Sequence, residues 1–257
     1  MNSPLIPVTK NKTSCQNCSV RKLTLFHHVP LSDLAWTENF RSDQFKVSAH
    51  KVIVHESKHS DYLFTVYHGW FAIYRTLENG KKHIIRVALP GDILCFQANL
   101  NAAMSYSISS LSDGILCAFP KKTIPEILSK NTFVAKRLSE MNARDMAICH
   151  QNMMTLAQRT AREKIAHLCI ELYHRLKVAN PDLDEKSIFF PLSQEDLGCA
   201  TGLTNIHINR TLKSLRNDGL MEIKSKCLAI YNFEELQKMS GFDKSTVEIH
   251  SLYEPFS

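Results

Sequence analysis

Short apolar segments separated by turns dominate the chain from Val29 to Pro120. Turn signals recur about every ten residues, a spacing that is typical of a β-barrel or β-sandwich. Asn79-Gly80 stands between two of these segments and predicts a tight hairpin, because both residues tolerate positive φ. Strands are therefore expected at residues 45–55, 62–67, 71–76, 83–89 and 115–119.

The pattern changes to a helical period after Pro120. A long helix is predicted from about Thr132 to Leu156, and it carries two apolar stripes. The stripes consist of Val134, Leu138, Met141 and Ile148, and of Met146, Cys149, Met153 and Leu156. Two stripes at different angles indicate two partners, the chain's own β domain and a second subunit. The alternative is one broad buried face in a monomer.

Two helix starts follow one another near the C-terminal end of the chain. Ser193 and Thr204 are both good N-caps, so each is expected to begin a helix. Gly202 stands in the turn between the two helices, and Gly219 ends the second one. A short helix, a turn containing Gly and a second capped helix are the sequence form of a helix-turn-helix.

The second of these helices, over residues 204–217, has an apolar face and a polar face. Ile208, Leu212 and Leu215 are expected to point inward. The outward face and a predicted basic wing over residues 221–230 carry the candidate DNA-binding residues Thr204, Asn205, Ile206, His207, Asn209, Arg210, Lys213, Lys224 and Lys226. Arg and Asn can each pair with a base edge through two hydrogen bonds. Hydroxyl groups and a helix N-terminus can hold phosphates. The alternative is a solvated helix with no partner.

Composition narrows the class of protein. A chain of 257 residues favours two domains, and a net charge of +6 suits a polyanionic partner such as DNA. Residues 1–28 lack apolar periodicity, so we expect a flexible arm there. No apolar run reaches the roughly 18–20 residues of a membrane helix, and no membrane partner is expected. Eight cysteines without signal-peptide features indicate reduced thiols and a cytoplasmic protein.

Enzymatic chemistry is not expected. The sequence shows no paired carboxylates, no nucleophile with a base and no phosphate-cradling glycine loop at usable spacing. A sensor module that regulates a partner protein without binding DNA is the alternative function. The basic wing after Gly219 favours DNA binding, because a pure sensor module has no use for it.

The residues resemble the CRP/FNR family of bacterial transcription regulators over nearly the whole chain. The segments that carry the resemblance are 66–70, 77–82, 89–94, the helix from Thr132, and Leu197–Thr204 with Asn209-Arg210. The resemblance implies an α+β protein with a cyclic-nucleotide-binding-like β-roll of jelly-roll type over residues 29–130. A dimerisation helix over 131–157 and a winged helix-turn-helix over 158–257 would follow. It also implies a homodimer that binds double-stranded DNA at a palindromic operator and works with RNA polymerase.

Roles carried over from the family fall on particular residues. The base readers would be Asn205, Ile206, Asn209 and Arg210, and the dimer seam would contain Met146, Cys149 and Met153. Well-known members carry an acid where this chain has Ile206, whose side chain can meet only a thymine methyl or nothing. The operator is therefore expected to differ from the well-known sites.

The sequence does not identify the ligand or chemical signal to which such a regulator would respond. Family members that bind cyclic AMP use a Glu and an Arg in the segment that here spans residues 93–107, and this segment contains neither. Cyclic AMP is therefore not expected, because its phosphate would lack a guanidinium partner.

The FNR branch holds an iron–sulfur cluster with four cysteines, and Cys15, Cys18 and Cys117 resemble three of them. The remaining position is Thr24, although Cys95, His27 or His28 could supply a fourth ligand. An iron–sulfur cluster or other metal, thiol redox sensing, haem, an unknown ligand and no ligand all stay open.

Overall fold

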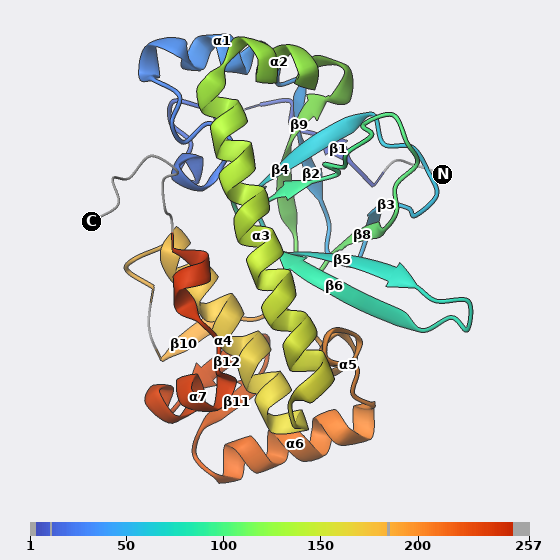
Figure 1. The fold of residues 1–257 in the computed structure, drawn as a ribbon, viewed down its shortest axis with the longest axis vertical. Coiled ribbons are helices and arrows are strands. Elements are labelled where there is room, and N and C mark those ends of the chain that lie inside the picture. The colour runs from blue at the N-terminus through green and yellow to red at the C-terminus, as the bar shows by residue number, and fades with distance from the viewer. Residues whose placement is uncertain (1–3, 11, 184–185, 249–257) are drawn as a thin grey trace. The chain divides into compact units, whose positions relative to one another are not determined.

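The computed structural model describes residues 4–10, 12–183 and 186–248. The chain forms two compact units. The first contains the chain up to Arg75 together with Ile85–Met141, and the second contains Thr76–Ile84 and the chain from Asn142 onward. The long helix α3 (Thr132–Gln158) contributes to both units, and Figure 1 shows it as one continuous helix.

Two antiparallel sheets make up the β-rich part of the chain. In spatial order, the first contains β1 (Ile6–Pro7), β2 (Asp43–Val47), β9 (Gly114–Pro120), β4 (Tyr62–His68) and β7 (Ile93–Leu94). The second contains β3 (Val52–Val54), β8 (Ser107–Ser110), β5 (Phe71–Thr76) and β6 (Lys82–Ala88). Phe64 and Leu116 of the first sheet and Phe71 and Ile108 of the second are buried in one apolar cluster. The expected β-roll is therefore confirmed.

The loops that join these strands contain most of the differences from the sequence-based expectations. The hairpin at Asn79-Gly80 is confirmed: β5 and β6 are neighbours, and Gly80 has a φ of 79°. The single strand expected at residues 45–55 is wrong. His50, with a φ of 60°, interrupts it, so that β2 and β3 belong to different sheets. The strands β1, β7 and β8 were not expected, because two to four residues carry little periodic signal.

The N-terminal arm is packed rather than flexible in its described residues, contrary to the expectation from sequence. The arm contains the short helical turn η1 (Arg21–Leu23), and η2 (Leu31–Asp33) and α1 (Leu34–Glu38) follow it along the chain. Leu25 and Phe26 are buried in the cluster that also contains Phe119 and Leu138. The arm was misjudged because its few apolar residues lack a period, yet each fills a place against the β-roll.

The segment η3 (Lys121–Thr123) and the helix α2 (Ile124–Lys130) lead from the β-roll into α3. The expected first stripe of α3 is buried at Val134, Leu138, Met141 and Ile148. Asn131 caps the helix, because its side-chain oxygen accepts a hydrogen bond from the Val134 amide at 3.2 Å. At 1.5 Å per residue, the helix is about 40 Å long.

The rest of the second unit is a small helical domain with one sheet. Its helices are α4 (Ala161–Ala179), α5 (Gln194–Thr201), α6 (Asn205–Asn217), α7 (Phe233–Ser240) and the turn η4 (Lys244–Val247). Its sheet has the order β10 (Ser187–Phe189), β12 (Cys227–Ile230) and β11 (Met221–Lys224). Ile165, Leu197, Ile208 and Leu215 are fully buried. In the part of the chain that is described, no helix has the length and apolar character needed to cross a membrane.

Candidate DNA interface and thiol pocket

The two helices expected from the cap residues are α5 and α6. Ser193 and Asp196 form a capping box at the start of α5, and the Thr204 hydroxyl accepts a hydrogen bond from the His207 amide at the start of α6. Gly202 has a φ of 70°, in the left-handed region, and turns the chain between the helices. The expected helix-turn-helix is therefore confirmed in its caps, its turn and its two helices.

The inner face of α6 fixes how the helix sits on its domain. Ile208, Thr211 and Leu215 are buried, whereas Leu212 is only half-buried. Arg162 of α4 reinforces this packing, since its guanidinium donates to the Ser214 hydroxyl and pairs with Asp218. No local sequence pattern predicts the Arg162 contact, because it joins residues about fifty positions apart.

The outer face of α6 and the β11–β12 hairpin gather all nine candidate DNA-binding residues on exposed positions. These are Thr204, Asn205, Ile206, His207, Asn209, Arg210, Lys213, Lys224 and Lys226. The Asn209 amide donates to the Asn205 carbonyl at 3.1 Å, a bond that is weak enough to exchange for a base edge. Ile206 is 79% exposed, an unusual position for an aliphatic side chain.

The wing ends in a two-residue turn. Lys224 pairs with Cys227 across the hairpin, and the tip residues Ser225 and Lys226 have φ values of 51° and 60°. Two left-handed residues are the geometry of a type I′ turn, which normally uses Asn and Gly. A Ser-Lys pair is strained there, and such strain is often retained at functional sites.

The second stripe of α3 is largely exposed within the second unit. Met146 and Met153 are 58% and 60% exposed, and Cys149 and Leu156 are half-buried. Met146 and Met153 are seven residues apart, so they lie within about 20° of each other around the helix axis. An apolar stripe of this kind on a helix is unusual unless another surface covers it.

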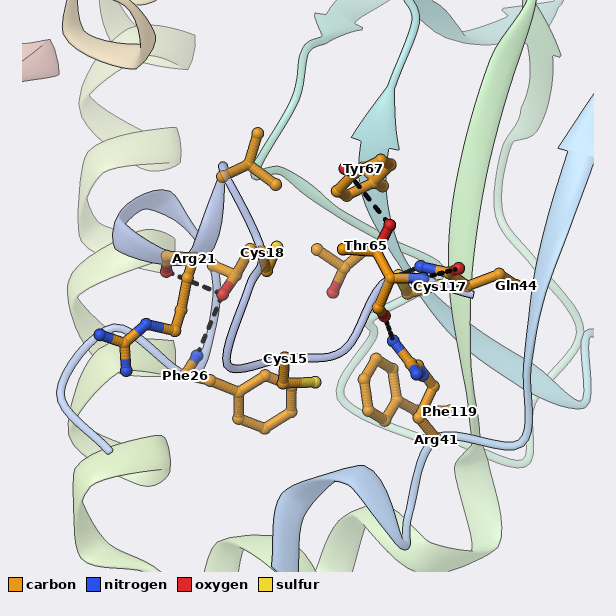
Figure 2. Close-up of a pocket in the computed structure, with 13 residues that line it drawn as sticks. Cys15, Cys18, Arg21, Phe26, Arg41, Gln44, Thr65, Tyr67, Cys117 and Phe119 are labelled. Carbon is orange, nitrogen blue, oxygen red and sulfur yellow. Dashed lines mark hydrogen bonds between the residues drawn. The ribbon is translucent and has the colours of Figure 1, made fainter. Parts of the chain in front are cut away.

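The three candidate metal-ligating cysteines line one small pocket in the first unit, with a cavity volume of about 30 Å³. Cys15 and Cys18 come from the arm and Cys117 from β9, and Figure 2 shows their side chains around one space. Thr24 lines the same pocket, whereas Cys95 is buried elsewhere. Among residues 4–10, 12–183 and 186–248, no three His, Cys, Asp or Glu side chains are placed to share a metal ion.

The polar side chains of the pocket come from positions that the sequence did not single out. The Gln44 side-chain amide donates to the Cys117 sulfur at 3.3 Å and accepts from the Thr13 amide at 3.0 Å. Arg41 donates to the Thr13 carbonyl at 2.6 Å. The Thr65 hydroxyl is buried and has no hydrogen-bond partner among the described residues. Isolated polar residues in strands give no sequence signal for such a pocket.

Burial governs the state of the arm thiols. Burial raises the pKa of Cys15 to about 12, although the nearby Arg41 charge lowers it in part. Burial also raises the pKa of Cys18. Both groups are therefore neutral thiols at neutral pH in this arrangement, and neutral thiols are poor nucleophiles.

Residues 93–107, where the family resemblance would place a cyclic nucleotide, contain no Lys or Arg. Arg86 lies beside this segment, but its guanidinium donates to the Ile93 carbonyl at 3.3 Å and lies 3.8 Å from the Asp92 carboxylate. Asp92 in turn accepts from the Leu89 amide at 2.9 Å. These contacts commit the Arg86 guanidinium and the Asp92 carboxylate to groups of the protein itself.

Comparisons with known proteins agree with both halves of this description. The chain matches the model of the cyclic nucleotide-binding domain over residues 44–131 and that of the Crp-like helix-turn-helix domain over residues 163–239. The second match covers α5, α6 and the wing, and it favours DNA binding over a sensor module that lacks this domain.

Relatives extend the likeness over most of the chain. The chain is 25% identical over 238 residues to the transcriptional activator protein FnrL of Cereibacter sphaeroides, with 89% of this chain and 92% of that protein covered. It is 20% identical over 231 residues to the fumarate and nitrate reduction regulatory protein of Escherichia coli, with 90% and 92% covered. The structure of FixK2 from Bradyrhizobium japonicum superposes with a TM-score of 0.68 at 21% identity, over 76% of this chain and 96% of that one.

Proposed function

The chain belongs to the CRP/FNR family of DNA-binding transcription regulators, and from this premise we propose that it works as a homodimer that reads a palindromic operator. In this proposal the recognition element is α6, and one helix from each subunit enters the major groove. The observation that carries the proposal is the exposure of all nine candidate DNA-binding residues on α6 and the wing.

The polar residues of α6 divide into two roles. Arg210 and Asn209, with Asn205, read base edges, because a guanidinium pairs with guanine and an amide with adenine. Thr204 and His207 hold phosphate at the helix N-terminus, where the first backbone N–H groups have no partner within the helix. Lys213, Lys224 and Lys226 supply further phosphate contacts, which add affinity but no sequence information.

Ile206 sets this operator apart from those of family members that carry an acid at this position. A carboxylate would accept from a cytosine amino group, whereas an isoleucine offers only apolar contact. Its high exposure leaves it free to reach a thymine methyl. We therefore propose thymine, rather than a pair that presents cytosine to this residue, at the matching operator position.

The dimer is proposed to form through the exposed stripe of α3, with Met146, Cys149, Met153 and Leu156 facing the same residues of a second copy. Two-fold symmetry then sets the two recognition helices one turn of DNA apart, at about 34 Å. RNA polymerase is the proposed further partner, and the cytoplasm is the proposed compartment, because a regulator acts where promoters lie. We assign the protein no catalytic role.

The signal is proposed to act on the first unit, in the β-roll or at the cysteine pocket. Cyclic AMP is not proposed, because Arg86 is committed to protein groups. A four-cysteine iron–sulfur cluster is not proposed either, because one of its positions is Thr24. We therefore propose that the signal is either a redox change of the cysteine thiols or the binding of a small ligand.

The test is a binding titration with an operator selected from randomised DNA by the wild-type protein. Arg210→Ala should weaken binding to this operator by about 1–3 kcal/mol, which is roughly 5- to 150-fold, and should relax base preference at one position. Binding to scrambled DNA should change far less, because the lost contact reads a base.

The matched control is Arg216→Ala. Arg216 is an exposed arginine of the same helix, lies about 120° from Arg210 around its axis and pairs with Glu222 at 3.5 Å. It should leave the preference for the operator over scrambled DNA unchanged. Equal operator binding by Arg210→Ala and wild type would remove Arg210 from the interface, and a footprint over a single half-site would contradict the dimer.

A further inference from the structure

The cysteine pocket contains one position that decides what it can hold. Cys15, Cys18 and Cys117 contribute sulfur to it, and Thr24 contributes a hydroxyl at the end of η1. The family resemblance places a fourth cluster ligand at Thr24. Three thiolates and one alcohol are not a usual ligand set for a [4Fe–4S] cluster, which is normally held by four thiolates.

The Thr24 side chain is already committed to the arm. Its hydroxyl donates to the Arg21 carbonyl at 2.9 Å and accepts from the Phe26 amide at 3.3 Å. The residue is 5% exposed. Turning this oxygen toward a metal would break both bonds and leave the Phe26 amide without its acceptor, at a cost of about 1–3 kcal/mol, whereas the Arg21 carbonyl would keep the hydrogen bond from the Thr24 amide at 3.0 Å.

The pocket beside Thr24 nevertheless contains a buried polar group without a hydrogen-bond partner among the described residues. Thr65 lines the same pocket, is 4% exposed, and its hydroxyl has no hydrogen-bond partner among the described residues. In Figure 2 it lies between Cys18 and Cys117. Most buried polar atoms in proteins are paired, so the Thr65 hydroxyl leaves hydrogen-bonding capacity unused in this pocket.

We propose that Thr24 is the specificity-determining residue of this pocket: it excludes a four-thiolate iron–sulfur cluster, and a thiol at this one position is sufficient to admit it. The natural chain would then present three thiols without a cluster. This inference deepens the proposed function at its cysteine pocket and rests on that part of it, but it is tested without DNA, so the DNA-binding proposal and this one can fail separately.

The experiment compares full-length wild type, Thr24→Cys and Thr24→Ser. Each is purified without oxygen, incubated with ferrous iron, sulfide and a thiol reductant, and desalted. Thr24→Cys should bind about four iron and four sulfide per chain and develop broad visible sulfur-to-iron absorption. Wild type and Thr24→Ser should bind no such cluster, because both keep a hydroxyl at this position.

A second substitution locates the iron. Adding Cys18→Ala to Thr24→Cys should return iron and sulfide to the wild-type level, since the set again has three thiols. Four irons on wild type would overturn the proposal whatever the variants do. A Thr24→Cys protein with wild-type circular dichroism and no iron would also overturn it, as would iron that survives Cys18→Ala.

Discussion

Replacing Met146 and Met153 together by Gln should separate the proposed dimer into monomers. Gln is polar, has nearly the length of Met and forms helices about as well, so the change should leave α3 intact. Both side chains lie on the same exposed stripe of this helix. The perturbation therefore tests burial of these two side chains against a second copy and little else.

The magnitude follows from their exposure. Burying a whole Met side chain contributes about 1.5–3 kcal/mol. Met146 is 58% and Met153 60% exposed, so covering the remainder contributes about 1–2 kcal/mol for each. A two-fold dimer contains both side chains twice, which gives about 4–7 kcal/mol. Because Gln keeps two methylene groups, we expect the lower end, a rise of about 1,000-fold in the dimer dissociation constant.

Sedimentation equilibrium over a range of protein concentrations measures this constant directly. Met154→Gln is the matched control, since Met154 is 63% exposed but lies about 100° from Met153 around the helix. It should dimerise like wild type. A double variant that dimerises as tightly as wild type would refute the reasoning, and so would a Met154→Gln protein that weakens the dimer as much.

Three other substitutions test the structure at separate points. Thr65→Val should raise the free energy of unfolding by about 1 kcal/mol in urea titrations, because it removes a buried hydroxyl without a partner; a loss of stability would mean that this hydroxyl is paired. Lys226→Gly should stabilise the wing by relieving a φ of 60°, while lowering the salt dependence of DNA binding by about one unit of log–log slope. An unchanged slope would remove Lys226 from the phosphate contacts. Burial, together with the nearby charges of His28 and Arg137, lowers the pKa of His27 from its ordinary 6.5 to about 4. As the pH drops, His27 is therefore protonated in the unfolded chain before it is protonated in the folded one. The free energy of unfolding should fall between about pH 6.5 and pH 4. His27→Gln should lose less stability than wild type across that window, and an equal loss would assign the pH dependence to other groups.

The DNA-binding half was the more predictable part because its signals are local. A cap, a glycine turn and a period of 3.6 each act within a few residues, so Thr204, Gly202 and the face of α6 could be placed from sequence. Even here Leu212 is only half-buried, and the anchoring contact of Arg162 depends on a distant helix. The short helix α7 was missed, although Asn232 caps it.

The sensing half was less predictable because its packing is made by residues far apart in the chain. Val8 donates to the Gln44 carbonyl, and Phe26 lies 5.3 Å from Phe119 between ring centroids. No periodic pattern within residues 1–28 predicts such contacts, and for this reason the sequence indicated a flexible arm. The pocket itself depends on the same contacts, which is why Cys15 and Cys117 could be proposed as neighbours only through a family resemblance.

The packed arm also ties the pocket to the long helix. The Arg137 guanidinium, buried in the first turns of α3, donates to the carbonyls of Leu23 and Thr24 and pairs with Glu140 at 3.1 Å. Shifting η1 would leave this buried cation without those acceptors unless α3 moved with it, and breaking a buried charged contact is costly. Arg137 belongs to the same helix, α3, as the proposed dimer stripe. The backbone around Thr24 is therefore one of the contacts that hold the first turns of α3 against the arm.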